Sequence, residues 1–455
     1  MTSFIAKTRE LFDRFDPKYV AFKRRVANFR YPSVKMGSLL SEPPEYGAGE
    51  AGIERLNDTT PRYIRITDID ENGELLPGLG MTAANVEPQY FLRDGDLLFA
   101  RSGNTVGKSY LHESERVSYP CFYAGYMIRF RFGEKVLPKY VFAFAQTPYY
   151  HEWVSAIQRS AGQPNINAQE YRNLEIPLPP LSEQRKIVAE LDAAYAAKRA
   201  ADEKATKLLA SIDDMVLNEL GIANLPKPDS SLSARMFIVS AKEVHNGRLD
   251  AYYYKGKFKE LTKKLSCCNC VPFGRLITEI YNGIDCRDYK ESGVPYLKVA
   301  NIKPGGFDFY DLKYIDSQEL GAKDIALRAG RMLLTRKGTF GNAIALSEDY
   351  DYAISSEVFC LSIKNELVDV HYLETFVNSS IGRMLCDKYK IGAIMGSLSQ
   401  EAVKALPIPL PDAKVQHRIA SRASSIRAEA RKLKADATAA LEAAKQKIEK
   451  CLLNN

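Results

Sequence analysis

A proline-stiffened stretch that runs into a long helical segment occurs twice in this chain. The first copy spans residues 176–220 and the second spans residues 408–453; both open with Ile-Pro-Leu-Pro and then continue with almost no helix breakers. Gln184 and Gln416 lie at matching places (416 − 184 = 232), and the same offset separates the two opening isoleucines. A shared offset at two landmarks indicates an internal duplication, and this constrains the fold of the whole chain.

The residue types of each copy predict an extended hinge followed by a helix. Alternate prolines exclude helix interior, whereas the alanine, glutamate, lysine and leucine that follow favour helix. Small or apolar residues then recur at steps of four and three, as in a coiled coil, and Lys198 and Asp202 interrupt this rhythm in the first copy. These positions are Val188, Leu191, Tyr195, Ala205, Leu209, Ile212 and Val216 in the first copy and Ile419, Ala423, Ile426, Ala430, Leu433, Ala437, Ala440 and Ala444 in the second. Because so narrow a stripe cannot stabilise an isolated helix, we expect the two helices to pack on each other.

Length and composition exclude several classes of protein. A chain of 455 residues exceeds one domain, and 45% hydrophobic with 26% charged residues is ordinary for a soluble protein. No stretch has the length of a membrane span, and residues 1–10 lack the apolar centre of a signal peptide, so we expect a cytoplasmic protein without membrane contact. The net charge of +7 permits a polyanionic partner without requiring one.

The duplication extends into the segments that precede each hinge. Alternating strands at 62–69 and 295–302, a glycine turn with an apolar strand ending in Arg-x-Gly at 92–103 and 327–338, and helix-like segments at 138–158 and 370–389 match in pairs. The sequence therefore predicts two mixed α/β domains. We place their boundaries at 1–175 for the first domain, 176–221 for its hinge and helix, 222–247 for a linker, 248–407 for the second domain, and 408–455 for its hinge and helix.

The motif that most resembles a catalytic one is the loop Gly103–Ser109. It has three residues between its glycines where a phosphate-binding P-loop has four, and the matching segment from Gly338 lacks the Lys-Ser pair. One interpretation is a simple glycine turn after a strand. The other is a basic loop that directs Arg101 and Lys108, or Arg336 and Lys337, toward a phosphate or a base edge.

No other catalytic or metal-binding set emerges from the sequence. The five histidines do not pair with carboxylates at triad or ligand spacing, and Cys267, Cys268 and Cys270 lack the second pair that a zinc ribbon needs. The stretch Ser41–Tyr46 differs from the Asp/Asn-Pro-Pro-aromatic motif of amino-methyltransferases, since its fourth position is Glu45. We therefore expect reduced thiols, no bound metal, no cofactor and no catalytic residue in this chain.

The duplicated hinge that leads into Ser-Glu-Gln-Arg-Lys-Ile resembles the DNA-specificity subunit of type I restriction-modification systems, over nearly the full length. The second copy departs from the first, since residues 412–415 replace Pro-Leu-Ser-Glu and His417 replaces Arg185. The resemblance implies two tandem target recognition domains, separated by two long conserved helices that form an antiparallel coiled coil with pseudo-twofold symmetry. It also implies that each domain reads half of a split double-stranded DNA site.

The same resemblance assigns the chemistry to other chains. Two adenine methyltransferase subunits and translocase-nuclease subunits would use S-adenosylmethionine, ATP and Mg²⁺, while this chain would be the non-catalytic specificity subunit. Alternatives are a DNA-binding or protein-interaction scaffold without a modification partner, a subunit of a related restriction type, and a P-loop enzyme. The candidate DNA contacts are Arg101, Ser102, Asn104, Lys108, Arg159, Gln163, Asn165, Arg336, Lys337, Thr339, Asn342, Lys390 and Ser397.

Overall fold

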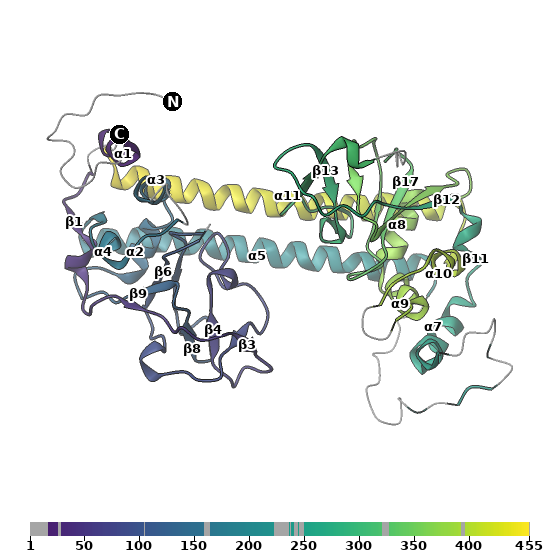
Figure 1. The fold of residues 1–455 in the computed structure, drawn as a ribbon, viewed down its shortest axis with the longest axis horizontal. Helices are drawn as coiled ribbons and strands as arrows, with labels where there is room; N and C mark the ends of the chain where they lie inside the picture. The colour runs from purple at the N-terminus through teal and green to yellow at the C-terminus, as the bar shows by residue number, and fades with distance from the viewer. Residues whose placement is uncertain are drawn as a thin grey trace. The chain divides into compact units, whose positions relative to one another are not determined.

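The computed structural model describes residues 17–25, 29–103, 105–158, 164–222, 236, 238–240, 244, 250–320, 327–392 and 396–454. The chain forms two compact units (Figure 1). Unit 1 comprises residues 1–201 and 434–455, and unit 2 comprises residues 202–433. Helices α5 (Leu181–Glu219) and α11 (Ala413–Leu452) contribute residues to both units. The expected linker at 222–247 lies mostly outside the described residues.

Unit 1 contains two four-stranded sheets, with orders β2-β9-β6-β7 and β3-β5-β4-β8, and a separate β1-β10 pair. Its strands are β1 (Ser33–Lys35), β2 (Glu45–Tyr46), β3 (Ile53–Glu54), β4 (Arg62–Ile64), β5 (Met81–Thr82), β6 (Leu97–Ala100), β7 (Ser109–Leu111), β8 (Cys121–Tyr123), β9 (Met127–Phe130) and β10 (Glu175–Pro177). Its helices besides α5 and α11 are α1 (Pro17–Arg25), η2 (Met36–Leu39), η3 (Ile66–Asp68), η4 (Pro88–Tyr90), α2 (Pro138–Phe144), α3 (Pro148–Ile157) and α4 (Ala168–Arg172).

Unit 2 contains a four-stranded sheet of order β12-β20-β17-β18, a three-stranded sheet of order β16-β13-β19, and the pairs β14-β15 and β11-β21. Its strands are β11 (Cys270–Pro272), β12 (Ile277–Asn282), β13 (Val294–Leu297), β14 (Ile302–Lys303), β15 (Gly306–Phe307), β16 (Lys313–Ile315), β17 (Arg331–Thr335), β18 (Ala343–Ala345), β19 (Ala353–Ile354), β20 (Val358–Ile363) and β21 (Pro407–Pro409). Its helices besides α5 and α11 are η5 (Ala251–Tyr254), α7 (Gly256–Leu265), η6 (Phe273–Arg275), η7 (Val299–Asn301), η8 (Ser317–Leu320), α8 (Val370–Asn378), α9 (Ser380–Tyr389) and α10 (Gln400–Ala405).

The two units repeat each other's internal connections. The central sheets have equivalent orders, and a parallel pair, β4-β8 or β13-β19, occurs in each second sheet. The hydroxyl of Tyr63 donates to the carbonyl of Ala48, and the hydroxyl of Tyr296 donates to the carbonyl of Ile284, both at 2.8 Å. The duplication read from the sequence is therefore present in the hydrogen bonds as well as in the strand order.

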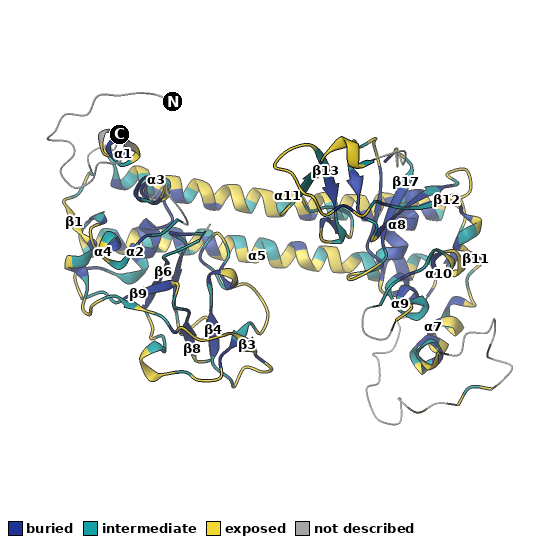
Figure 2. Cartoon of the chain, viewed as in Figure 1, coloured by how far each residue is buried: buried dark blue, intermediate teal, exposed yellow. Residues whose placement is uncertain are grey.

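The core of each unit lies between its central sheet, its short helices and one stretch of each long helix (Figure 2). In unit 1, Leu191 of α5 and Leu441 of α11 belong to the same buried cluster, and Lys447 pairs with Glu190 at 2.6 Å. In unit 2, the other ends of the two helices meet, and Arg418 pairs with Glu219 at 2.8 Å. The helices are thus antiparallel in both units, which confirms the mixed α/β fold with an antiparallel helix pair.

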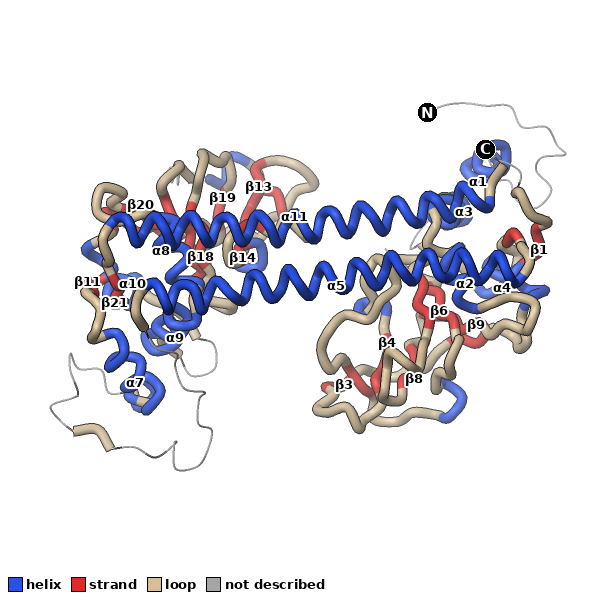
Figure 3. Tube along the Cα trace, turned by 180° about the vertical axis from the view of Figure 1, so that it is seen from behind, coloured by secondary structure: helices blue, strands red, loops and turns tan. Residues whose placement is uncertain are grey.

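The hinge glutamine explains why the same Pro-x-Pro and Gln spacing appears twice. The amide of Gln184 accepts from the backbone N–H of Leu137 at 2.9 Å and donates to the carbonyl of Pro179 at 2.9 Å. The amide of Gln416 makes the same two bonds, to Asp369 and Pro411. In each unit one buried side chain therefore joins the hinge, the start of a long helix and the N-terminus of a shorter helix, α2 in unit 1 and α8 in unit 2. The first hinge also forms strand β10, which pairs with β1, and the second hinge forms strand β21, which pairs with β11 (Figure 3).

Replacement of Gln184 by methionine is expected to lower the free energy of unfolding of unit 1 by about 2–3 kcal/mol, because the N–H of Leu137 and the carbonyl of Pro179 would remain buried without partners. Hydrogen exchange of unit 1 amides measures this loss, with unit 2 amides as an internal reference. The exposed neighbour Arg185 provides the control, since Arg185→Ala is expected to change little. Equal protection in wild type and Gln184→Met would contradict the role of this side chain.

Two helices expected as single segments are each divided. The segment 138–158 forms α2 and α3, because Pro148 begins a new helix that is capped by the hydroxyl of Thr147. The segment 370–389 forms α8 and α9, and Ser379 caps the second of these with its side chain. The expected strands at 62–69 and 295–302 likewise end early, since a turn of 3₁₀ helix follows β4 and β13.

The helical seam also differs from the expected one at two places. Leu209 is 40% exposed and Ala440 is exposed, whereas Leu441, Ile448 and Leu452 are buried. In α11 the buried positions after Leu433 thus follow two successive steps of four residues. This shifts the seam by one residue relative to the alternating steps of four and three in a strict heptad. Among the described residues, no helix has both the length and the apolar character that a membrane crossing requires.

Candidate nucleic-acid interface

Each unit carries a pair of loops that brings the Arg-x-Gly turn against the loop before the hinge. In unit 1, the backbone N–H of Arg101 donates to the carbonyl of Tyr126, and the backbone carbonyl of Arg101 accepts from the N–H of Ile166. Ser102 forms an isolated β-bridge with Asn165. We call the segments 101–107 and 164–167 the first loop pair. The strand β6 ends at Ala100, so the arginine emerges at the edge where the sheet stops.

Unit 2 repeats this arrangement with different side chains. The backbone N–H of Arg336 donates to the carbonyl of Glu357, and the backbone carbonyl of Arg336 accepts from the N–H of Leu398. Lys337 forms an isolated β-bridge with Ser397. We call the segments 336–342 and 396–398 the second loop pair. The structure therefore places the predicted residues Arg101, Ser102 and Asn165 together in one unit and Arg336, Lys337 and Ser397 together in the other.

The two arginines are held in the same way. The guanidinium carbon of Arg101 lies 4.8 Å from the centre of the Tyr46 ring, and that of Arg336 lies 5.2 Å from the centre of the Phe359 ring. The Nε atom of each arginine is buried and has no hydrogen-bond partner among the described residues. A guanidinium stacked on an aromatic ring is fixed in orientation, and its outer N–H groups can donate to a base edge or to a phosphate.

A basic cavity of about 340 Å³ adjoins Arg336. Arg287, Lys298, Arg336 and Lys337 line it with the carboxylates of Asp285 and Glu357, so positive charges outnumber negative ones. The ammonium of Lys337 lies 4.0 Å from Glu357, and both side chains are about half exposed. This surface suits a polyanion, because such weakly paired cations remain available to an external phosphate.

Three predicted residues make internal bonds instead. The ammonium of Lys108 donates to the carbonyl of Ile69 at 3.0 Å and lies 3.2 Å from Glu71. The side-chain amide of Asn342 is buried and donates to the carbonyl of Ile302 at 2.7 Å. Lys390 pairs with Asp387 at 2.8 Å. These contacts hold the loop pairs in shape, whereas Thr339 is exposed at the tip of its turn.

The first loop does not have the geometry of a P-loop. The backbone N–H groups of Val106, Gly107 and Lys108 donate to carbonyls of the loop and of β6, namely those of Gly103, Ala100 and Thr105. Amides engaged in this way are not directed at a phosphate, which argues against the P-loop alternative. Asn104, Arg159 and Gln163 lie outside the described residues, so their predicted roles stay predictions.

The Ser41–Tyr46 stretch is a loop that ends in strand β2, and its acids are neutralised within unit 1. Glu42 pairs with Arg131 at 2.7 Å, and Glu45 pairs with Arg129. The aromatic residue that follows, Tyr46, is the last residue of β2, and its ring lies beneath the guanidinium of Arg101. This stretch therefore supplies the ring beneath the arginine and has no free acidic group of the kind that grips an amino group.

Asp387 organises the segment that carries Lys390. Its carboxylate accepts from the hydroxyl of Tyr252 at 2.9 Å and from the ammonium groups of Lys257 and Lys390 at 2.7 and 2.8 Å. Burial acts to raise the pKa of Asp387, but these hydrogen bonds outweigh it and hold the pKa below the ordinary value. A carboxyl group with a lowered pKa in the folded state stabilises that state above its unfolded pKa and ceases to do so as the pH falls.

Replacement of Asp387 by asparagine is therefore expected to lower the free energy of unfolding of unit 2 at neutral pH by about 1–2 kcal/mol, the contribution of charge-assisted hydrogen bonds in a half-buried site. The difference between variant and wild type should shrink as the pH drops below about 4, the ordinary range of an aspartate. Urea unfolding between pH 3 and pH 7 measures both effects. The exposed Asp351→Asn is the control, and a pH-independent difference would contradict the assignment.

Comparison with known proteins gives the family. The type I restriction modification DNA specificity domain matches this chain twice, over residues 63–208 and 283–443, which together exceed half of its length. The chain belongs to this family. The two matched segments fall on the two repeats, and each contains a loop pair with its stacked arginine.

Relatives of this specificity subunit are distant in sequence. It is 23% identical to the EcoKI specificity subunit of Escherichia coli K12 over 394 residues, which cover 83% of this chain and 77% of the relative. It is 23% identical to the Escherichia coli EcoBI specificity subunit over 289 residues, 63% of this chain and 58% of the relative. The HsdS subunit of Thermoanaerobacter tengcongensis, a solved structure, is 17% identical with a TM-score of 0.34, covering 92% of this chain and 95% of that one.

Sequence reasoning did not find the aromatic partners of the arginines in this specificity subunit. In the sequence, Tyr46 precedes Arg101 by 55 residues (101 − 46) and Phe359 follows Arg336 by 23 residues (359 − 336), so no shared spacing connects the two pairs. The sequence did contain a signal for Lys298, which lines the basic cavity beside Arg336. Lys298 and Arg65 occupy matching positions in the duplicated strands (298 − 65 = 233). In both cases the backbone N–H of the basic residue is bonded by the side chain three positions later.

Proposed function

We propose that this specificity subunit reads a bipartite, asymmetric site in double-stranded DNA, one half with each loop pair. The observation that carries the proposal is the pair of equivalent arginines just beyond the end of a strand, each lying over an aromatic ring with a buried Nε that has no described hydrogen-bond partner. The side chains around them differ between the units, with Ser102 and Asn165 in one and Lys337 and Ser397 in the other. Different side chains at equivalent places would select different base sequences.

The chemistry would belong to partner chains. In the proposed complex, two adenine methyltransferase subunits bring S-adenosylmethionine, and translocase-nuclease subunits bring ATP and Mg²⁺, while this chain acts in the cytoplasm as a non-catalytic scaffold. The occupied amides of the Gly103–Ser109 loop support a role without nucleotide chemistry. Arg101, Arg336, Lys337 and Thr339 are the proposed direct contacts, with Ser102, Asn165 and Ser397 beside them. Lys108, Asn342 and Lys390 would position the loops.

A methylation assay tests the proposal directly. Purified chain and its adenine methyltransferase partner are incubated with a randomised duplex library and labelled S-adenosylmethionine. Modified molecules are expected to share two short specified segments separated by an unspecified spacer. Methylation without sequence preference, or a single continuous motif, would contradict the proposal.

A further inference from the structure

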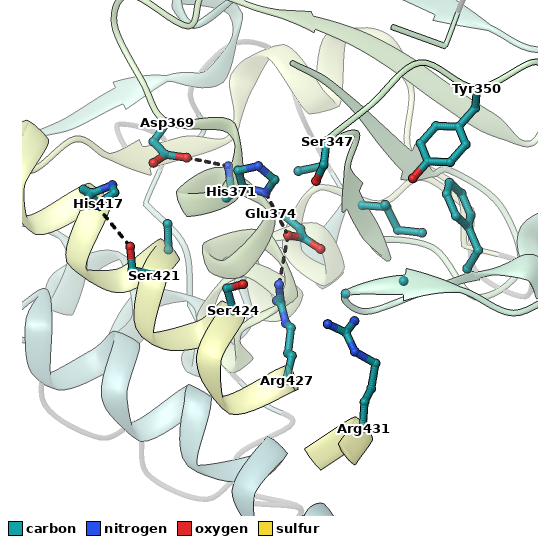
Figure 4. Close-up of a pocket in the computed structure, with 16 residues that line it drawn as sticks. Ser347, Tyr350, Asp369, His371, Glu374, His417, Ser421, Ser424, Arg427 and Arg431 are labelled. Atoms are coloured by element: carbon teal, nitrogen blue, oxygen red, sulfur yellow. Dashed lines mark hydrogen bonds and ion pairs between the residues drawn. The ribbon is translucent and has the colours of Figure 1, made fainter. Parts of the chain in front are cut away.

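Unit 2 contains a polar cavity on the side of α11 that faces the β14-β15 hairpin. Its volume is about 630 Å³, and it lies between α8, α11 and the β14-β15 hairpin (Figure 4). Gly306, Ser347, His371, Ser424 and Arg431 line it together with Arg427. None of these residues belongs to the second loop pair, so the cavity is distinct from the proposed DNA-reading surface.

At the equivalent place in unit 1, three carboxylates and three cations form ion pairs with one another. Glu74 pairs with Arg199 at 2.5 Å and with Arg116 at 3.3 Å. Glu113 pairs with Arg116 at 2.9 Å and with Lys139 at 2.6 Å. Asp192 adds a bond to Lys139 at 2.8 Å. The result is a continuous ion-pair network that joins the turn after η3, the segment after β7, helix α2 and helix α5.

The internal repeat shows what replaces these carboxylates in unit 2. The turn glycines Gly73 and Gly305 have nearly equal φ angles of 78° and 79°, which aligns Glu74 with Gly306. The β6-β7 pair in unit 1 and the β17-β18 pair in unit 2 have matching registers, and this match aligns Glu113 with Ser347. The hinge offset aligns Asp192 with Ser424 (424 − 192 = 232). All three carboxylates of the unit 1 network are therefore absent at the matching positions of unit 2.

One of the three cations, Arg199, is retained in unit 2. Arg431 matches Arg199 (431 − 199 = 232) and makes no hydrogen bond or ion pair with any residue that the structure describes. The other charges of the cavity are engaged: Arg427 binds Glu374 at 3.0 Å, and Asp369 caps the N-terminus of α8. His371 lies 4.0 Å from Glu374, and this neighbouring carboxylate raises the pKa of the histidine.

We propose that this cavity receives a carboxylate from an acidic segment of a second protein chain, which pairs with Arg431 as Glu74 pairs with Arg199 in unit 1. The repeat itself identifies the chemistry, because the same architecture is completed there by glutamate and aspartate side chains. Three hydroxyls, those of Ser347, Ser421 and Ser424, supply further donors for a carboxylate. Unit 2 thereby has a protein-docking site that unit 1 fills with its own residues.

A binding experiment with an acidic probe tests this inference without DNA or a methyltransferase, so its failure is separate from failure of the proposed function. Fluorescence anisotropy follows a labelled hexaglutamate peptide added to the full chain. Arg431→Ala is expected to weaken binding about tenfold, the loss of one charge-assisted hydrogen bond. Gly306→Glu is expected to do the same by supplying the carboxylate internally, and no atom lies within 4 Å of the Cβ that this residue would add.

Matched variants separate the cavity from general attraction to a basic protein. Gly306→Gln adds the same bulk without charge, Lys432→Ala removes a neighbouring cation outside the cavity, and Arg199→Ala removes the unit 1 equivalent; each is expected to leave binding within about twofold. Equal binding by wild type, Arg431→Ala and Gly306→Glu would overturn the proposal, as would no saturable binding by wild type. Binding of tripolyphosphate but not of hexaglutamate would also overturn it, in favour of a phosphate ligand.

Discussion

Alanine in place of Arg101 is expected to relax base preference in one half of the DNA site and to leave the other half unchanged. Loss of a guanidinium that reads a base edge costs about 1–3 kcal/mol of discrimination at that position. The expected locality follows from the structure, because the described partners of Arg101, namely Tyr126, Ile166 and the ring of Tyr46, all belong to unit 1. Arg336→Ala is expected to have the same effect on the other half.

The ring beneath the arginine gives a matched control for this result. Tyr46→Leu removes the surface on which the guanidinium lies and should weaken the same half-site preference, whereas Tyr46→Phe keeps the ring and should retain it. Methylation of the randomised library by each variant complex measures the preference. A uniform loss of methylation on all sequences after Arg101→Ala would identify a phosphate contact instead and would remove Arg101 from base reading.

An alanine at Gly47 is expected to lower the free energy of unfolding of unit 1 by about 3 kcal/mol or more, near the upper end of overpacking effects. Its Cβ would lie 2.4 Å from the carbonyl oxygens of both Tyr123 and Ala124, which belong to the backbone and cannot rotate away. Gly283 in unit 2 is equivalent, with a Cβ at 2.1 Å from the carbonyl oxygen of Ile354. The same effect is therefore expected of Gly283→Ala in unit 2.

Gly47→Ala is also expected to alter the proposed DNA surface, because Gly47 directly follows Tyr46, whose ring lies beneath Arg101. Urea unfolding and hydrogen exchange measure the stability change, and the library assay measures the effect on one half-site. Gly49→Ala provides the control in the same loop, since no atom lies within 4 Å of its added Cβ. Similar losses for Gly47→Ala and Gly49→Ala would show that the close approach of the backbone is not the cause.

The features that the sequence predicted well depend on spacing. The offset shared by Gln184 and Gln416 revealed the repeat, and the structure gives its reason in the identical bonds of the two amides. Spacing did not predict that Leu209 lies on the exposed side of its helix, nor that a new helix begins at Pro148 within the segment 138–158. Such details depend on packing against segments that are distant in the chain.

The candidate site was predicted in part for the same reason. The Arg-x-Gly turns pointed to Arg101 and Arg336, which the structure holds alike. The partners that direct them come from other strands, and so do the groups that engage Lys108 and Asn342. A sequence pattern identifies a basic or amide side chain near a turn, but only the fold decides whether its donors face another part of the chain or the solvent.

Methylome sequencing of a host that carries this chain and its methyltransferase partner tests the central claim most directly. The expected result is adenine methylation at a motif with two different specified halves and a fixed unspecified spacer, where Arg101→Ala broadens one half and Arg336→Ala broadens the other. A motif that neither variant alters, or methylation that persists at the same motif without this chain, would contradict the account.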